Sequence, residues 1–275
     1  MAYYAPERLS EALGLLAADG MVLVAGGTDF YPGLAPGGPR GSLVDVTRID
    51  GLRGITRVGD GWRIGAATRW SDVARADLSA AFDALRAAAR EVGSVQIQNA
   101  GTVAGNICNA SPAADGVPPL LALETEVEIA SESAVRRVAL ADFITGVRKV
   151  ALQRGEMVVA LHVPDMPEGT RSAFAKLGSR EYLVISIAML AVNWRLDAAG
   201  RFDVARVAVG ACSPVARRLK ALEAALIGQR PAEVAITREH LADLAPIDDL
   251  RGSAGYRLGA VAEMLGRTLR EAGNG

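Results

Sequence analysis

The stretch Ala25-Gly26-Gly27-Thr28-Asp29, which follows a short Val-rich apolar run, decides how the first part of this chain folds. A second stretch of similar character, Gly101-Thr102-Val103-Ala104-Gly105-Asn106, lies well downstream. In both, glycines let backbone N–H groups approach an anion closely, and hydroxyl and amide side chains offer further hydrogen bonds. Two such stretches, far apart in the sequence, suit a ligand with two phosphates, such as a dinucleotide.

Neither stretch fits a familiar nucleotide-binding fingerprint. The G-x-G-x-x-G pattern of the Rossmann fold is absent from the first stretch, and no lysine follows its glycines as a Walker loop requires. Taken alone, the first stretch is equally typical of a tight turn after a strand. Thr28 and Asp29 could also cap a short helix, whose N-terminus would favour an anion.

The region that surrounds the second stretch, residues 96–115, is rich in amide and hydroxyl side chains and has one carboxylate, Asp115. It is too polar for a core and too weakly charged for an ordinary solvated surface. This composition indicates backbone held in tight shapes around a polar ligand. Asp115 is suited to accept hydrogen bonds from a ribose.

The composition excludes several classes of partner and location. The net charge of −1 over 275 residues argues against nucleic acid as a main partner. No uncharged apolar run approaches the roughly 20 residues of a membrane span. The first residues lack the charged and apolar regions of a signal peptide. We therefore expect a cytoplasmic protein with no membrane span.

The few cysteines and histidines argue against a metal site on this chain. They are Cys108, Cys212, His162 and His240, and no two of them lie at metal-ligand spacing. A zinc site, an iron–sulfur cluster and a His-based catalytic triad are all disfavoured. We predict no metal ligand and no catalytic side chain, so redox chemistry would require a bound organic cofactor.

The pattern of apolar residues and of glycine and proline predicts an α+β fold in two parts. The expected elements of the first part are a helix from Pro6 to Gly20, strands at 21–25, 43–46, 55–58, 62–66, 127–129, 135–138 and 157–163, and helices at 79–92 and 120–123. Residues 164–169 form the best linker because they are rich in proline and glycine. The tail is expected to contain strands at 172–177, 184–196 and 201–212, then helices at 214–227, 231–241 and 253–272.

Six motifs in a fixed order produce a resemblance to a known family. They are Ala25-Gly-Gly-Thr-Asp29, Gly93-Ser-Val-Gln-Ile-Gln-Asn99, Gly101-Thr-Val-Ala-Gly-Asn106, Ser111-Pro-Ala-Ala-Asp115, Phe174-Ala-Lys176 and Arg251-Gly-Ser-Ala-Gly-Tyr-Arg257. With these motifs, the chain resembles the FAD-binding medium subunit of molybdenum hydroxylases, the family of xanthine dehydrogenase and carbon monoxide dehydrogenase. The resemblance covers nearly the whole chain.

The resemblance implies a two-lobed FAD-binding domain of the PCMH type at residues 1–165, with lobes at about 1–54 and 55–165. A C-terminal α+β domain, an antiparallel sheet with helices, is expected at 171–275. In this family, a molybdopterin large subunit oxidises the substrate, and a small subunit with two 2Fe–2S clusters relays electrons to FAD. The flavin then passes them to NAD or another acceptor. A dimer of heterotrimers and noncovalent FAD are expected.

The resemblance also implies the residues that bind FAD. Those expected at the diphosphate and ribityl chain are Ala25, Gly26, Gly27, Thr28, Asp29, Phe30, Thr102, Val103, Ala104, Gly105 and Asn106. Ser111 and Asp115 are expected beside the ribityl and adenosine groups. Val158 and Lys176 are expected near the isoalloxazine. On these grounds, Asp115→Ala and Gly27→Val are expected to lower FAD occupancy while leaving the fold intact.

Two features qualify the resemblance. The family usually has Gly-Gly-Asn where this chain has Ala104-Gly105-Asn106, and a positive φ at Ala104 would be strained. Lys176, without a flavin beside it, is more typical of a solvated strand lysine than of a site residue. Two rival functions also remain open: a self-contained flavin oxidase of the vanillyl-alcohol-oxidase type, and a flavin or nucleotide carrier without catalysis. The substrate of the enzyme cannot be predicted from this chain.

Overall fold

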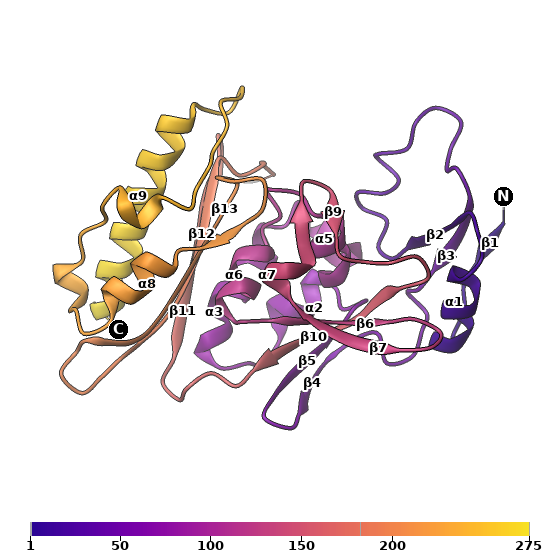
Figure 1. Ribbon diagram of the computed structural model, residues 1–275, viewed down its shortest axis with the longest axis horizontal. Coiled ribbons are helices and arrows are strands. Elements are labelled where there is room, and N and C mark those ends of the chain that lie inside the picture. Colours follow the sequence, from indigo (N-terminus) through magenta and orange to yellow (C-terminus); the bar gives the residue numbers. More distant parts are fainter. Residues whose placement is uncertain (1, 182, 275) are drawn as a thin grey trace.

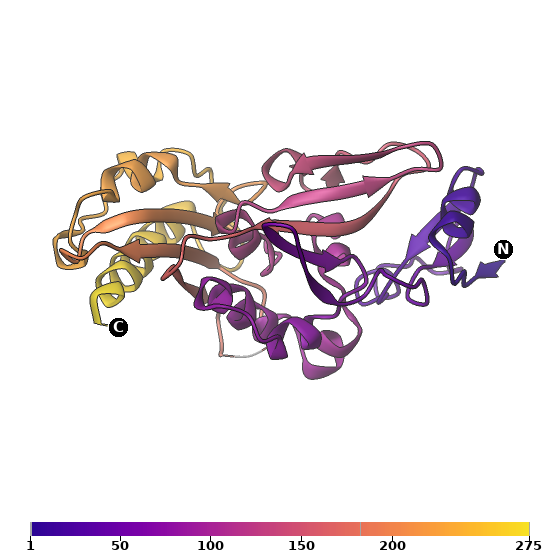
Figure 2. The ribbon, with the colours of Figure 1, turned by 90° about the horizontal axis from the view of Figure 1, so that it is seen from below.

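The protein is described by a computed structural model, in which residues 2–181 and 183–274 are placed. Three larger sheets follow one another along the long axis of the molecule in chain order (Figure 1; Figure 2). The N-terminal lobe lies at one end, a middle lobe holds the second sheet, and the C-terminal domain lies at the other end (Figure 1). The two lobes and the domain are described in turn below.

The N-terminal lobe is a small parallel sheet covered by one helix. Its strands lie in the order β1 (Tyr3–Tyr4), β3 (Ser42–Asp45) and β2 (Met21–Val24), and its helix is α1 (Leu9–Leu16). Apolar residues at helical spacing place Ala12 and Leu13 against Val44 of β3. Gly20, with a φ of 72°, adopts the left-handed conformation after this helix, before the chain enters β2.

Replacing Gly14 in α1 with alanine should stabilise the protein. Gly14 is exposed, has no positive φ, and a methyl group at its Cα would contact nothing within 4 Å. Because glycine in a helix loses more backbone entropy on folding than alanine does, the gain should be about 0.5–1 kcal/mol. The free energy of unfolding in urea measures it, and a loss of stability would contradict this placement of the glycine.

The middle lobe is an antiparallel sheet with the short helices packed around it. The strand order is β4-β5-β10-β6-β7, with bounds β4 (Ile55–Val58), β5 (Gly61–Gly65), β10 (Met157–Pro164), β6 (Glu126–Ala130) and β7 (Val135–Ala139). A short hairpin of β8 (Ile144–Gly146) and β9 (Lys149–Val150) follows β7. The two predicted hairpins, residues 55–66 and 127–138, are confirmed to within one or two residues.

The helices of this lobe are α2 (Trp70–Arg75), α3 (Asp83–Glu91) with a 3₁₀ turn at Ala80–Phe82 before it, α4 (Val95–Ala100), α5 (Val103–Asn109), α6 (Val117–Ala122) and α7 (Leu140–Phe143). One apolar core joins their inner faces to Ile64 of β5 and Leu161 of β10. Helices α2, α3 and α4 lie together on one side of the sheet (Figure 2). Residues 95–109, where the sequence predicted backbone held in tight shapes and no helix, are largely helical.

The C-terminal domain is an antiparallel sheet between two layers of helices. Its strand order is β11 (Arg171–Leu177), β12 (Ala188–Leu196), β13 (Phe202–Gly210) and β14 (Arg217–Arg218). Helices α8 (Lys220–Leu226) and α9 (Ala254–Glu271) pack on one face, while α3 and α6 of the middle lobe pack on the other (Figure 1). The sheet therefore shares one core with the middle lobe and a second with its own helices.

The structure corrects three expectations about the tail. The strand expected at 184–196 begins at Ala188. The helix expected at 214–227 is replaced by β14, which pairs with β13, followed by the short α8. The helix expected at 231–241 is two 3₁₀ turns, Pro231–Glu233 and Glu239–Leu241. Between these turns the β-branched residues Val234, Ile236 and Thr237 disfavour continuous helix.

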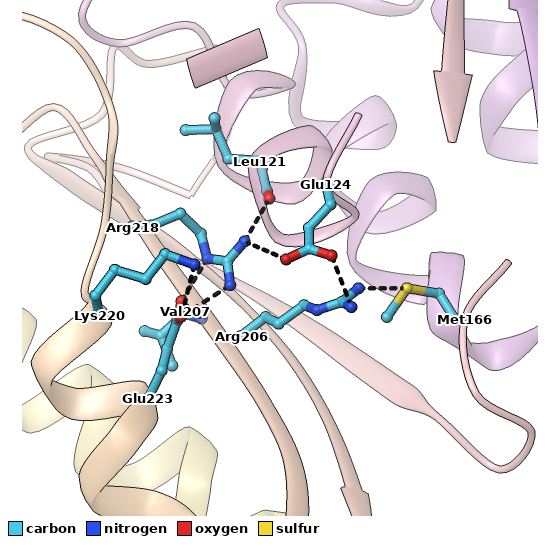
Figure 3. Close-up of polar contacts among 8 residues, drawn as sticks. All are labelled: Leu121, Glu124, Met166, Arg206, Val207, Arg218, Lys220 and Glu223. Atoms are coloured by element: carbon cyan, nitrogen blue, oxygen red, sulfur yellow. Dashed lines mark hydrogen bonds and ion pairs between the residues drawn. The ribbon is translucent and has the colours of Figure 1, made fainter. Parts of the chain in front are cut away.

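A network of charged side chains joins the end of α6 to the C-terminal domain (Figure 3). The Glu124 carboxylate lies 2.7 Å from a nitrogen of Arg206 and 3.4 Å from one of Arg218. Arg218 also pairs with Glu223, whose carboxylate accepts a hydrogen bond from the backbone N–H of Val207 at 2.9 Å. Oppositely charged groups thus hold β13, β14 and α8 to the middle lobe.

The Glu223 carboxylate should contribute stability that depends on pH. Burial alone would raise the pKa of Glu223, but the hydrogen bonds and charges of its partners outweigh burial and lower it below 4.5. Its contribution is therefore fully present above pH 4.5 and is lost as the pH falls through the lowered pKa. Glu223→Gln should cost about 1–3 kcal/mol at neutral pH, with a difference from the unmodified chain that shrinks in acid. Urea unfolding at several pH values tests this, and a difference independent of pH would contradict it.

Among residues 2–181 and 183–274, no helix is both long enough and apolar enough to cross a membrane.

Candidate functional site

A cleft of about 370 Å³ opens where the end of β2 meets α5 and β10. Residues of both glycine stretches line it, together with Val158 of β10. The predicted site residues in its wall are Ala25, Gly26, Gly27, Thr28, Asp29, Phe30, Thr102, Ala104, Gly105, Asn106 and Val158. The two glycine stretches, 70 or more residues apart in the chain, are therefore brought together on one cleft.

Gly26 is required by the close approach of the first stretch to Ala100 of α4, and Gly27 is required by its backbone conformation. A Cβ on Gly26 would lie 1.9 Å from the carbonyl oxygen of Ala100, a distance no real side chain tolerates. Gly27 has a φ of 68°, which disfavours any residue with a side chain. A Cβ on Gly101 would lie 3.3 Å from Oγ1 of Thr28, so the contact is tight from both sides.

The first stretch presents unused backbone donors to the cleft. It is closed by hydrogen bonds from the N–H of Tyr31 to the Gly27 carbonyl, at 3.0 Å, and from Gly33 to the Asp29 carbonyl, at 3.1 Å. These are hydrogen-bonded turns, so Thr28 and Asp29 do not cap a helix. Among the described residues, none accepts a hydrogen bond from the N–H groups of residues 26–30. Successive free N–H groups of this kind form a concave site for an anion.

The second stretch has a different role, because it forms the beginning of α5. The side chain of Thr102 caps this helix and accepts a hydrogen bond from the N–H of Gly105 at 3.1 Å. The N–H groups of Val103 and Ala104 donate to carbonyls of residues 68 and 66. Of the N–H groups of residues 101–106, all but that of Thr102 are thus already used, and the stretch contributes mainly surface and side chains to the cleft.

Two individual residues of the second stretch behave differently from expectation. Ala104 lies inside α5 without a positive φ, so the strain anticipated for its methyl group does not arise. Val103 is fully buried in the core of the middle lobe and does not line the cleft. The first turn of α5 therefore needs an apolar anchor at 103 and a small residue at 104 and 105.

Asn106 supplies the clearest sign of a missing ligand. Asn106 is one of the residues that line the cleft, and its side-chain oxygen Oδ1 is buried without a hydrogen-bond partner among the described residues. A buried acceptor of this kind is costly unless a donor reaches it. The ribityl chain of FAD carries hydroxyl donors, and its diphosphate needs N–H donors of the kind that residues 26–30 present. The residues of this cleft therefore fit FAD.

Lys176 and Asp115 form a buried ion pair at the edge of the middle lobe. Their charged atoms lie 2.9 Å apart, and the two side chains are only 7% and 11% exposed. Lys176 also donates to the Glu91 carbonyl at 3.2 Å, and the Ser186 hydroxyl donates to Asp115 at 2.9 Å. Burial raises the pKa of Asp115, and Lys176 and Ser186 oppose that rise. Lys176 is thus not a solvated strand lysine.

Lys176 lines a second cavity, of about 430 Å³, together with Glu91 and Phe174. Glu91 and Val92 are neighbours in the chain, and Val92 lines the first cleft, so both hollows reach the end of α3. Asp115 lines neither wall, and both of its oxygens accept hydrogen bonds from protein groups. Ser111 accepts a hydrogen bond from the N–H of Ala113 and also lies outside both linings.

The cleft is also lined by residues that the sequence analysis did not assign to the FAD site. They are Leu23, Val46, Ala66, Trp70, Val92, Ile97, Cys108, Asn109 and Met157. Most are apolar residues at the ends of strands and helices, and nothing in their local sequence distinguishes them from core. Burial raises the pKa of the Cys108 thiol to about 12, so it stays protonated and unreactive. In the described part of the chain, no three His, Cys, Asp or Glu side chains gather into a possible metal site.

Comparison with known families covers both parts of the chain. The family described as the FAD binding domain in molybdopterin dehydrogenase matches residues 1–166. The family described as the CO dehydrogenase flavoprotein C-terminal domain matches residues 173–272. The xanthine dehydrogenase FAD-binding subunit of Escherichia coli O157:H7 is 35% identical over 279 aligned residues, which cover 98% of this chain and 95% of that subunit.

Solved structures agree with these matches. The fold is similar to a carbon monoxide dehydrogenase of Hydrogenophaga pseudoflava that lacks the Mo-pyranopterin moiety of its molybdenum cofactor, with a TM-score of 0.88, 30% identity and coverage of 99% of this chain and 96% of that one. It is also similar to reconstituted CO dehydrogenase from Oligotropha carboxidovorans, with a TM-score of 0.91, 26% identity and coverage of 100% and 98%. The chain therefore belongs to the family of FAD-binding medium subunits of xanthine dehydrogenase and CO dehydrogenase, which are oxidoreductases.

Proposed function

We propose that this chain is the electron-transfer subunit of a molybdenum hydroxylase, which passes electrons from 2Fe–2S clusters of a partner subunit through FAD to NAD or another acceptor. The observation that carries the proposal is the cleft that both glycine stretches line, where the N–H groups of residues 26–30 have no acceptor and Oδ1 of Asn106 has no donor among the described residues. Bound FAD supplies the ability to accept electrons singly and release them as a pair. The residues described here hold it and exclude water.

The FAD diphosphate is proposed to lie on residues 25–30, where the backbone donors are free. The surface of α5 at Thr102, Gly105 and Asn106 would face the ribityl chain. Val158 and Lys176 are proposed to flank the isoalloxazine, since Lys176 lines the neighbouring cavity. Asp115 was expected beside the ribityl and adenosine groups; because it pairs with Lys176 at 2.9 Å, we propose instead that the Lys176–Asp115 pair as a whole lies beside the isoalloxazine. We propose noncovalent binding, because residues 25–30 contain no His or Cys to which the flavin could be attached.

We propose partners that hold the metals: a small subunit with iron–sulfur clusters and a large subunit with the molybdopterin cofactor, arranged as a dimer of heterotrimers. Support comes from the relatives, whose names describe medium chains and FAD-binding subunits of dehydrogenases that act on xanthine and carbon monoxide. Because these substrates differ so widely among chains of one fold, we place the substrate pocket on the large subunit. The cytoplasmic location stays a prediction.

Co-expression with the neighbouring genes tests the assembly. The chain is expected to copurify at equal stoichiometry with one iron–sulfur and one molybdenum polypeptide, and substrate should then reduce the flavin. Flavin reduction that needs no partner chain would contradict the electron-relay role. Isolation of the chain as a FAD-loaded monomer that binds neither partner would contradict the proposed assembly.

A further inference from the structure

Arg257 is a buried cation in an unfavourable place. It lies in the first turn of α9, which Ser253 caps, and there the helix dipole opposes a positive charge. The residue is only 1% exposed, and its guanidinium lies 2.6 Å from an oxygen of Asp249. Because a buried cation at the N-terminus of a helix is unfavourable, we expect the Arg257 side chain to be kept for its contacts with another part of the structure.

The guanidinium ties α9 to the start of β12. Its Nη1 donates to the carbonyl of Ile187 at 2.5 Å and to the carbonyl of Ala211 at 3.1 Å. The N–H of Ile187 donates in turn to the Leu177 carbonyl at 2.7 Å, at the end of β11. Arg257 therefore fixes the point at which the chain returns to the sheet after leaving β11.

A continuous buried chain of contacts leads from that point to the charged pair. Ser186, directly before Ile187, is 1% exposed and donates its hydroxyl hydrogen to Oδ1 of Asp115 at 2.9 Å. The other oxygen of Asp115 accepts from Lys176 at 2.9 Å. The position of Ile187 thus sets the orientation of Ser186, and Ser186 holds one of the two oxygens of Asp115.

We propose that Arg257 is a positioning residue for the flavin: by holding Ile187 it places Ser186, which orients the Asp115–Lys176 pair. The inference rests on the proposed function, which sets that pair beside the isoalloxazine. It gives the C-terminal domain a direct part in binding the cofactor. A simple anchor for α9 would stabilise the protein without changing how the folded protein binds FAD.

A double-mutant cycle on the full chain separates these two roles. FAD affinity is measured by flavin fluorescence for Arg257→Met, Ser186→Ala and the double variant, at a temperature where circular dichroism shows each to be folded. Each single change should weaken FAD binding about tenfold, and the double variant should be no weaker than either one, since both act through one network. The visible flavin spectrum should shift alike in all three. Arg267→Met, on the exposed side of the same helix, is the matched control and should bind normally.

If Arg257→Met does not fold, the same FAD affinities are measured for Arg257→Lys and Ser186→Ala. Lysine keeps a charge for Asp249 but lacks the fork that reaches Ile187 and Ala211, so affinity should still fall. Unchanged affinity in a folded Arg257 variant, or additive losses in the double variant, overturns this inference alone. Failure of the unmodified chain to bind FAD overturns the proposed function and this inference together.

Discussion

Replacing Gly26 with alanine should cost the protein most of its affinity for FAD. The new methyl group would lie 1.9 Å from the Ala100 carbonyl oxygen, so residues 25–30 must move away from α4 and α5. Overpacking of this kind costs about 1–3 kcal/mol, and the displaced N–H groups no longer converge on one anion. We expect the dissociation constant of FAD to rise about ten- to hundredfold, measured by titration of the isolated chain.

The matched control is Gly14→Ala, which adds the same methyl group where it contacts nothing. Gly27→Val should act in the same direction as Gly26→Ala, because the φ of 68° at this position strains any β-branched residue. Gly26→Ala with full FAD affinity would mean that the cofactor does not lie on this loop.

Asp115→Ala should destabilise the FAD-free protein by about 3–5 kcal/mol, because it leaves the buried Lys176 ammonium without its partner. On the sequence alone this change was expected to leave the fold intact. The structure adds the stability cost, since both carboxylate oxygens accept hydrogen bonds from protein groups. Unfolding in urea, followed by tryptophan fluorescence, measures the loss.

Removing both members of the Lys176–Asp115 ion pair should destabilise the protein less than Asp115→Ala alone does. Asp115→Ala combined with Lys176→Met removes the unpaired charge and should recover part of the loss. Asp203→Ala is the surface counterpart, because Asp203 pairs with Arg195 where both side chains are 34% exposed, and it should cost less than about 1 kcal/mol. If Asp115→Ala and Asp203→Ala lowered the free energy of unfolding equally, the buried Lys176–Asp115 pair would contribute no more than a surface ion pair.

The sequence predicts much of the local structure. The turn signal Gly59-Asp60-Gly61 between two short strands predicts the β4–β5 hairpin, and the Val-rich run before Gly26 predicts β2. The meeting of the two glycine stretches on one cleft follows from the family resemblance. Both Ser94 and Thr102 accept hydrogen bonds as helix caps, and their positions were the available signals for α4 and α5.

What the sequence does not predict depends on contacts between distant segments. The N–H groups at the start of α5 are used by carbonyls of residues 66 and 68, so only the structure distinguishes the free donors of the first stretch from the occupied donors of the second. The pairing of Lys176 with Asp115 joins residues on different domains. The sequence shows that Arg257 belongs to the motif Arg251–Arg257, but its hydrogen bond to the Ile187 carbonyl depends on the packing of α9 against β12.

The most direct test of the account is the flavin content of the isolated chain. After reconstitution with FAD and gel filtration, the protein should show the flavin absorption bands with one FAD per chain, and acid precipitation should release the flavin because it is bound noncovalently. A correctly folded chain that retains no flavin after the same treatment would contradict the assignment of this cleft as the FAD site.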